Sequence, residues 1–304
     1  MNSHKTSIAF AALCISLLAG CGSGSSSNYS SNSGSTGGTS NTIPTGIYSG
    51  TGTISGHYSL NGATYSFYNT PTIVGIVTSS GNYELLSYSP ASPNTVSQID
   101  QGNATVSNSD FVALTDYGYG LASTFTPNNV ATFPYQGSGS LAGNFTLNSS
   151  MTGVITYTTG SDVLTYTLNY AAASTTTAAV SNIAGTYNGN FYPNGTVSFT
   201  GISNAGTLTI AADGSITGTI ACAGGYSTAA TTYDPCLVSG TVTARSDVNA
   251  YNFSLTFANN TTGGQVPSQW AGKTFSGMGY YDAATKRFML GIIASDGTAF
   301  GFSN

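Results

Sequence analysis

Short runs in which apolar and polar residues alternate recur along the chain from residue 43 onward. The clearest is Tyr-Asn-Phe-Ser-Leu-Thr-Phe at 251–257, where four large apolar side chains share one face because side chains alternate along a strand. Runs at 162–168 and 207–210 repeat the pattern. Such alternation predicts half-buried β-strands. Gly, Thr, Ser, Tyr and Asn dominate the same region and are poor or middling helix formers, so we expect an all-β chain.

Turn dipeptides separate these runs. Strong hairpin dipeptides occur at Asn61-Gly62, Asn194-Gly195, Asp213-Gly214 and Asp296-Gly297. They are typical of type I′ turns, which need positive φ at both central residues. The segment Asp-Ala-Ala-Thr-Lys-Arg at 282–287 predicts a longer hairpin loop. Strands joined by tight hairpins run antiparallel, so the expected sheets are antiparallel.

A repeated opening motif divides the chain into two blocks. Ile-Pro-Thr-Gly-Ile-Tyr-Ser-Gly at 43–50 resembles Ile-Ala-Gly-Thr-Tyr-Asn-Gly at 183–189. We therefore expect two small tandem domains, each an antiparallel up-and-down β-barrel or β-sandwich. They are placed at 43–172 and 181–304, with a low-complexity linker at 173–180.

The second block has the more regular pattern. Eight strands are predicted near 185–192, 196–201, 206–211, 215–221, 236–244, 250–257, 274–281 and 286–293, and a short run at 298–302 is a ninth candidate. An up-and-down sheet of this size has two exposed edges unless it closes into a barrel. Small barrels fill their interior with side chains or hold one small ligand. In the first block, residues 87–109 are interpreted as loop-rich and Gly118-Tyr-Gly120 as a bulge or bend.

The first twenty residues have the character of a secretory signal peptide. Lys5 supplies positive charge, and the apolar run at 7–18 is too short to cross a membrane. Leu18-Ala-Gly-Cys21 then resembles the lipobox of bacterial lipoproteins. This resemblance implies a signal peptide at 1–20, cleavage before Cys21, and a membrane anchor through lipid on that cysteine. In Gram-negative lipoproteins an aspartate after the cysteine usually means retention at the inner membrane, so Gly22 favours the outer membrane.

The composition predicts a disordered tether after the signal peptide and limits the classes of binding partner. Residues 22–41 are almost entirely Gly, Ser, Thr and Asn, and with the lipidated cysteine they form a disordered segment at 21–42. A coil of this length reaches roughly 25 Å on average. The mature chain has four basic and ten acidic residues, a formal net charge of −6. There is no basic patch in the sequence, so nucleic acid is a poor partner.

Two cysteines remain once Cys14 is cleaved off and Cys21 is lipidated. Cys222 and Cys236 would lie in an oxidising compartment, where a disulfide between them is the economical interpretation. It would close a loop of fifteen residues, worth about 3 kcal/mol in the chain-entropy model. Zinc is the alternative, but two thiolates without a nearby histidine make a poor four-ligand site. No metal or cofactor site is therefore assigned.

Candidate catalytic residues are few. His57 is the only histidine of the mature chain, and with no Gly-x-Ser-x-Gly elbow in the sequence it is interpreted as a strand or turn residue. Glu84, the only glutamate, is interpreted as a solvated strand end. Asp110 and Asp116 flank an apolar stretch, as aspartates that bound a strand commonly do. A run at 137–142 imitates a dinucleotide fingerprint but lacks its strand–helix context. No catalytic residue is assigned.

Aromatic residues are abundant, with 20 tyrosines and 14 phenylalanines. Tyrosine-rich surfaces suit adhesion and carbohydrate contact. Alternating aromatics within strands are more typical of the core and of cross-strand pairs, and we favour that interpretation.

Three family resemblances follow from these motifs. The opening at 184–187 and the hairpin at 206–218 are similar to the avidin-like barrel, but Trp270 is the only tryptophan and biotin binding is not carried over. The mature chain more closely resembles uncharacterised proteobacterial lipoproteins, which share the tether, tandem β modules, a late cysteine pair and the hairpin at 280–287. A looser likeness is to two-barrel surface lipoproteins that capture host transferrin or factor H, although function does not follow from fold.

The sequence thus favours a non-enzymatic, outer-membrane-anchored lipoprotein with a binding, adhesion or envelope-assembly role. Its expected partners are the membrane, through Cys21, and a protein or glycan at the cell surface. The alternative is a periplasmic carrier that holds a small apolar ligand in a barrel interior. A hydrolase acting through His57 ranks last.

Overall fold

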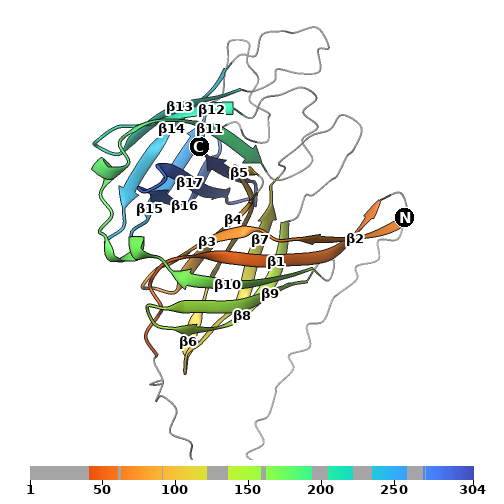
Figure 1. The fold of residues 1–304 in the computed structure, drawn as a ribbon. Coiled ribbons are helices and arrows are strands. Elements are labelled where there is room, and N and C mark those ends of the chain that lie inside the picture. The colour runs from red at the N-terminus through yellow and green to blue at the C-terminus, as the bar shows by residue number, and fades with distance from the viewer. Residues whose placement is uncertain are drawn as a thin grey trace, which may run out of the picture. The chain divides into compact units, whose positions relative to one another are not determined.

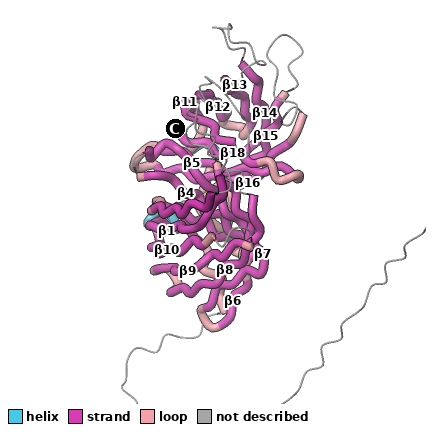
Figure 2. The backbone as a smooth tube through the Cα atoms, turned by 90° about the vertical axis from the view of Figure 1, so that its right-hand side faces the viewer, coloured by secondary structure: helices cyan, strands magenta, loops and turns pink. Residues whose placement is uncertain are grey.

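The computed structural model describes residues 41–60, 63–90, 92–121, 136–158, 162–193, 205–221, 235–258, 270 and 272–304. Among these residues, antiparallel strands joined by turns account for most of the chain, with two short 3-10 helices (Figures 1 and 2). Residues from Thr39 to Asn304 form one compact unit. The predicted all-β, antiparallel fold class with tandem barrels is confirmed.

The first barrel, called barrel 1, is a closed ring of eight antiparallel strands. Its order is β1, β3, β4, β5, β7, β8, β9 and β10, and β10 pairs with β1 to close the ring. The bounds are β1 (Gly46–Leu60), β3 (Thr72–Val77), β4 (Asn82–Ser89), β5 (Ser92–Asn103), β7 (Asp110–Gly120), β8 (Gln136–Thr146), β9 (Ser150–Tyr157) and β10 (Val163–Tyr170). Two strands lie outside the ring: β2 (Ala63–Asn69) pairs with β1, and β6 (Thr105–Ser107) pairs with β7.

The second barrel, called barrel 2, closes in simple sequence order, and its last strand pairs with its first. The strands are β11 (Gly185–Pro193), β12 (Ala205–Ile210), β13 (Ser215–Ala221), β14 (Pro235–Ala244), β15 (Tyr251–Phe257), β16 (Thr274–Asp282), β17 (Arg287–Ala294) and β18 (Ala299–Ser303). The ninth candidate strand is therefore the one that closes the barrel. The strand expected at 196–201 lies outside the described residues. Between the barrels lie η1 (Ala172–Thr175) and η2 (Val180–Asn182).

The alternation seen in the sequence fills the interior of barrel 2. In β15, Tyr251, Phe253, Leu255 and Phe257 are buried while the residues between them are more exposed. Their inward neighbours are mostly aromatic, so rings pack on one another through the barrel. These include Phe191, Trp270, Phe275, Phe288, Phe300 and Phe302. Side chains therefore occupy this interior, as is usual for small eight-stranded barrels.

The interpretation of residues 87–109 as loop-rich is wrong. The end of β4, all of β5 and all of β6 lie there. The alternation was hidden because the inward positions of β5 include polar Asp100. The bulge expected at Gly118–Gly120 is also displaced, since the register shift of β7 against β8 lies between Ala113 and Asp116.

Two of the predicted hairpins form with a different turn geometry. Gly214 and Gly297 have φ of 86° and 83°, but the aspartates before them do not have positive φ. In each turn the glycine N–H donates to the carbonyl three residues earlier, at Ala211 and Ala294. This is a type I turn followed by a left-handed glycine, in place of the expected type I′ turn. The other two predicted Asn-Gly turns lie outside the described residues.

The repeated opening motif has the same local structure in both barrels. The Tyr48 hydroxyl donates to the Pro44 carbonyl at 2.9 Å, and the Tyr187 hydroxyl donates to the Ile183 carbonyl at 2.9 Å. Each tyrosine thus ties the first strand of its barrel to the segment that enters it. The motif marks the entry of each barrel.

The two barrels contact one another through a shared apolar cluster. Strands β3, β4 and β5 of barrel 1 contribute to it, as do β17 and β18 of barrel 2, through Val74, Ile76, Leu86, Val96, Ile99, Met289 and Ala299 among others. Gly291 and Gly301 are cross-strand partners, and a Cβ on Gly301 would lie 2.7 Å from Val96 Cβ. The glycine pair leaves a flat surface on which barrel 1 packs.

Candidate functional site

The interior of barrel 1 contains a buried pair of carboxyl groups. Asp100 on β5 is opposite Gly118 on β7, and Asp116 on β7 is opposite Gly102 on β5. Residues two apart on a strand share a face, so both carboxyls point inward as diagonal neighbours. Both side chains have no exposed surface.

Tyrosines cover these carboxyls in the space that the glycines leave. The Tyr83 hydroxyl donates to Asp116 Oδ1 at 2.5 Å, and the Tyr157 hydroxyl donates to Asp100 Oδ1. A Cβ at Gly102 would lie 2.5 Å from the Tyr83 hydroxyl, and one at Gly118 would lie 2.5 Å from the Tyr157 ring. The glycines are therefore required for this arrangement, because any side chain there would displace a tyrosine.

Burial controls the ionisation of the pair. Loss of hydration raises the pKa of Asp100 to about 7, although hydrogen bonds from Tyr157 and Gln98 act in the opposite direction. Burial and the neighbouring Asp100 together raise the pKa of Asp116 to about 8, against the hydrogen bond from Tyr83. The two carboxyls thus titrate near neutral pH, and both are far from their ordinary values.

Two polar atoms of this cluster have no hydrogen-bond partner among the described residues. They are Asp116 Oδ2 and the hydroxyl oxygen of Tyr166, a residue that is 4% exposed. The Tyr166 ring lies over Gly153, its cross-strand neighbour. Buried polar atoms without partners are costly. The buried cluster is a titratable element of the core of barrel 1.

Glu84 is buried at the contact between the barrels, so the interpretation of a solvated strand end is wrong. It is 1% exposed, and its Oε2 accepts a hydrogen bond from the Met278 backbone N–H of β16 at 3.0 Å. Its Oε1 has no hydrogen-bond partner within the described part of the chain, and a Cβ at Gly291 would lie 2.4 Å from that oxygen. Burial raises the pKa of Glu84 well above its ordinary value. Burial at this contact thus favours the protonated form of Glu84.

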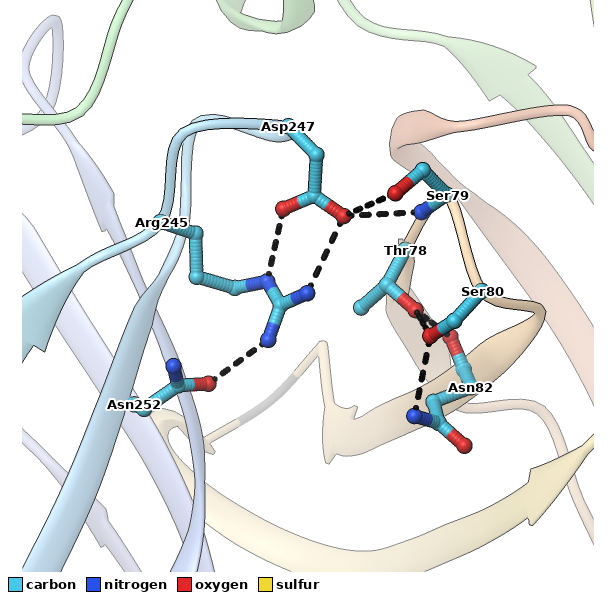
Figure 3. A network of polar contacts seen from close by, with 7 residues as sticks. All are labelled: Thr78, Ser79, Ser80, Asn82, Arg245, Asp247 and Asn252. Atoms are coloured by element: carbon cyan, nitrogen blue, oxygen red, sulfur yellow. Dashed lines mark hydrogen bonds and ion pairs between the residues drawn. The ribbon is translucent and has the colours of Figure 1, made fainter.

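An ion pair adds a polar link between the barrels (Figure 3). In the turn between β14 and β15, Arg245 donates to Asp247 through Nε at 2.9 Å and Nη2 at 3.0 Å. Asp247 Oδ2 also accepts the backbone N–H and the hydroxyl of Ser79, in the β3–β4 turn of barrel 1, both at 2.8 Å. Burial opposes ionisation here, but these hydrogen bonds outweigh it and lower the Asp247 pKa to about 2.

Rows of uncharged hydroxyl side chains cross the outer surfaces of both barrels. On barrel 2, one row runs through six neighbouring strands at Thr186, Thr209, Thr217, Ser239, Thr256 and Thr274. On barrel 1, a row runs from β9 to β1 at Thr152, Thr167 and Thr51. Neighbouring strands lie about 4.8 Å apart, so the hydroxyls form regular neutral arrays. Neutral hydroxyl side chains thus take the place of charged ones on these outer faces.

The remaining candidate residues do not converge. His57 is an exposed residue of β1, in agreement with the strand interpretation. Asp110 is exposed at the start of β7 and bounds the strand as predicted, but Asp116 lies inside that strand and is buried. The run at 137–142 lies within β8, where buried and exposed residues alternate.

The partner of Asp116 is Asp100, which sequence reasoning missed. The signal was an Asp-x-Gly pattern at both 100–102 and 116–118.

The cysteine predictions are only partly within the described chain. Cys236 lies in β14 and its side chain is completely buried in the core of barrel 2. Cys21 and Cys222 lie outside the described residues. Lipidation and the disulfide therefore stay predictions.

No helix of the described residues has the length and apolar character needed to cross a membrane. No group of three or more His, Cys, Asp or Glu side chains in the same residues is arranged to hold a metal ion.

Comparison with known proteins identifies no family. The sequence matches no protein-family model and no curated protein. Among solved structures, the chain is similar to the crystal structure of isotype 1 transferrin binding protein B from serogroup B Neisseria meningitidis. The TM-score is 0.28 at 12% identity, over 84% of this chain and 76% of that chain. A likeness at this level is too weak to transfer a function.

Proposed function

We propose that this chain is a lipid-anchored outer-membrane lipoprotein that acts by binding a protein or glycan partner, without catalysis. The observation that carries this proposal is the hydroxyl row across six strands of barrel 2, which offers a partner neutral hydrogen-bonding groups in a regular array. The lipobox at Leu18–Cys21 and the tether supply the anchor.

The distribution of ionisable groups supports a binding role. Four carboxyls of the described residues have a raised pKa. Asp100, Asp116 and Glu84 are enclosed in the core or at the contact between the barrels, and Asp162 is 5% exposed beside the β1 edge. Asp162 accepts the backbone N–H of the exposed His57, so this carboxylate is engaged by the main chain of β1. Acid–base catalysis needs such groups within hydrogen-bond reach of a substrate. The aromatic packing inside barrel 2 also weighs against a carrier of an apolar ligand in that barrel.

The anchor is tested first, by labelling cells with a fatty-acid analogue. Wild type should incorporate the label and Cys21→Ala should not. Protease added to intact cells then distinguishes surface display from a periplasmic orientation.

Binding is tested with a photo-crosslinking amino acid at Thr217, in the centre of the hydroxyl row. The matched control carries it at Ala283, which is exposed in the β16–β17 turn. Irradiated cells should yield adducts to an envelope protein or glycan at position 217 that are missing at position 283. Equal adducts at both positions, or none at 217, would count against the proposal.

A further inference from the structure

Strands β1 and β2 form an arm, residues 54–60 and 63–69, that runs beyond the wall of barrel 1 (Figure 1). The pairing of β1 with β10 ends at Ser55, whereas its pairing with β2 continues to Leu60. Beyond Ser55, β2 is the only neighbour of β1 among the described strands. The second edge of β2 has no strand partner among the described residues.

One edge of the arm is covered. The backbone N–H of His57 on β1 donates to Asp162 Oδ1 at 3.1 Å. Asp162 precedes β10 and is 5% exposed. This carboxylate occupies the β1 edge at the position where β10 no longer pairs with it.

At the edge of β2 that is not paired with β1, backbone N–H and C=O groups point outward. In an antiparallel pair, residues alternate between hydrogen-bonded and non-hydrogen-bonded positions. The His57 N–H points to Asp162, away from β2, so His57 and its partner Ser66 form a non-hydrogen-bonded pair. The N–H and C=O of Ser66 therefore point to the open edge, and by alternation so do those of Thr64 and Tyr68. Ser66 is exposed, and Tyr68 is 70% exposed.

This edge lacks the features by which proteins prevent edge pairing. Natural edge strands are commonly guarded by charged residues, proline or bulges. The sequence of β2 is Ala-Thr-Tyr-Ser-Phe-Tyr-Asn, without charge or proline, and its register with β1 has no shift. A two-stranded ribbon by itself is marginally stable in water, so a further strand would stabilise the arm.

We propose that the open edge of β2 pairs antiparallel with the same edge of a second copy of this chain, with the two-fold axis at Ser66. The pairing joins two arms into a four-stranded ribbon in which both open edges are used and the outer edges are those covered by Asp162. A single extended segment from a different protein would leave its own second edge open. Residues 54–69 carry no Lys, Arg, Asp or Glu, so the two arms do not repel. The contact is isologous and closed.

A cysteine cross-link tests this register in the full-length protein in intact cells. In the proposed pairing, Ser66 faces Ser66 of the other copy at a hydrogen-bonded position, where Cα atoms are about 5.5 Å apart, within disulfide range. Mild oxidation of Ser66→Cys should give a reducible dimer. The control Ala63→Cys lies on the same strand, but in this register its two copies are about 20 Å apart and should stay monomeric, as should wild type.

A proline variant supplies an independent measurement. Ser66→Pro removes the outward N–H but not a bond to β1, so the melting temperature should be unchanged. The dimer loses two symmetry-related hydrogen bonds, and its association constant in detergent should fall about tenfold or more. Equal cross-linking of Ala63→Cys and Ser66→Cys, an unchanged association constant, or cross-linking of Ser66→Cys to a different protein would each overturn the proposal. None of these results depends on whether Cys21 is lipidated.

Discussion

The buried carboxyl pair of barrel 1 predicts that Asp116→Asn reduces the pH dependence of stability. The variant side chain has nearly the same shape and carries no titratable proton. Its amide oxygen can still accept the Tyr83 hydroxyl hydrogen that Asp116 Oδ1 accepts in wild type. The substitution therefore removes the ionisation with little change in packing.

The magnitude follows from the difference between the pKa values of the folded and unfolded chains. An unfolded Asp ionises near pH 3.9, whereas the pKa of buried Asp116 is about 8. Between these values the folded protein holds a proton that the unfolded chain has released, so stability falls as pH rises. Each pH unit costs about 1.4 kcal/mol, and the step from pH 4 to pH 7 costs wild type about 4 kcal/mol through this carboxyl. Asp100 adds a loss of the same sign that the variant retains.

The assay is urea unfolding at a series of pH values from 4 to 8. The free energy of unfolding of wild type should fall with pH more steeply than that of Asp116→Asn, by about 1.4 kcal/mol per unit at most. Asp110→Asn, at the exposed start of the same strand, is the matched control and should follow wild type. If Asp116→Asn keeps the wild-type slope, Asp116 is not protonated in the folded state and the reasoning is refuted.

Three further predictions concern the contact between the barrels and the cysteines. Gly291→Val places a side chain against Glu84 Oε1, where a Cβ already comes within 2.4 Å; the free energy of unfolding in urea should fall by about 1–3 kcal/mol, and an unchanged value would show that the contact is adaptable. Asp247→Ala removes four hydrogen bonds and should destabilise by about 1–3 kcal/mol, with faster amide exchange in the β3–β4 turn; unchanged exchange there would contradict the link. Mass spectrometry of non-reduced peptides should find Cys222 joined to Cys236, and free thiols at both would disprove the disulfide.

Local pattern determined much of this fold. Alternation along the strands, the hairpin turns and the closing strand of barrel 2 all follow from residues within a few positions of one another. The repeated opening motif could also be recognised in the sequence, and Tyr48 and Tyr187 make the same short-range hydrogen bond. Turn type was predicted less well, because only the glycines of the two Asp-Gly turns take positive φ.

Which residues far apart in the sequence become neighbours is determined by the tertiary structure alone. Asp100 and Asp116 are diagonal neighbours because β5 and β7 pair directly with β6 outside the ring, and no local pattern specifies that register. Glu84 is buried because β4 has one face inside barrel 1 and the other against barrel 2. The unbroken apolar runs at 73–77 and 288–293 were the available signal, since strands buried on both faces lose their alternation. Alternation of apolar and polar residues along a strand indicates that one of its faces is buried. Where both faces are buried, only the packing of the two barrels shows what covers the second face.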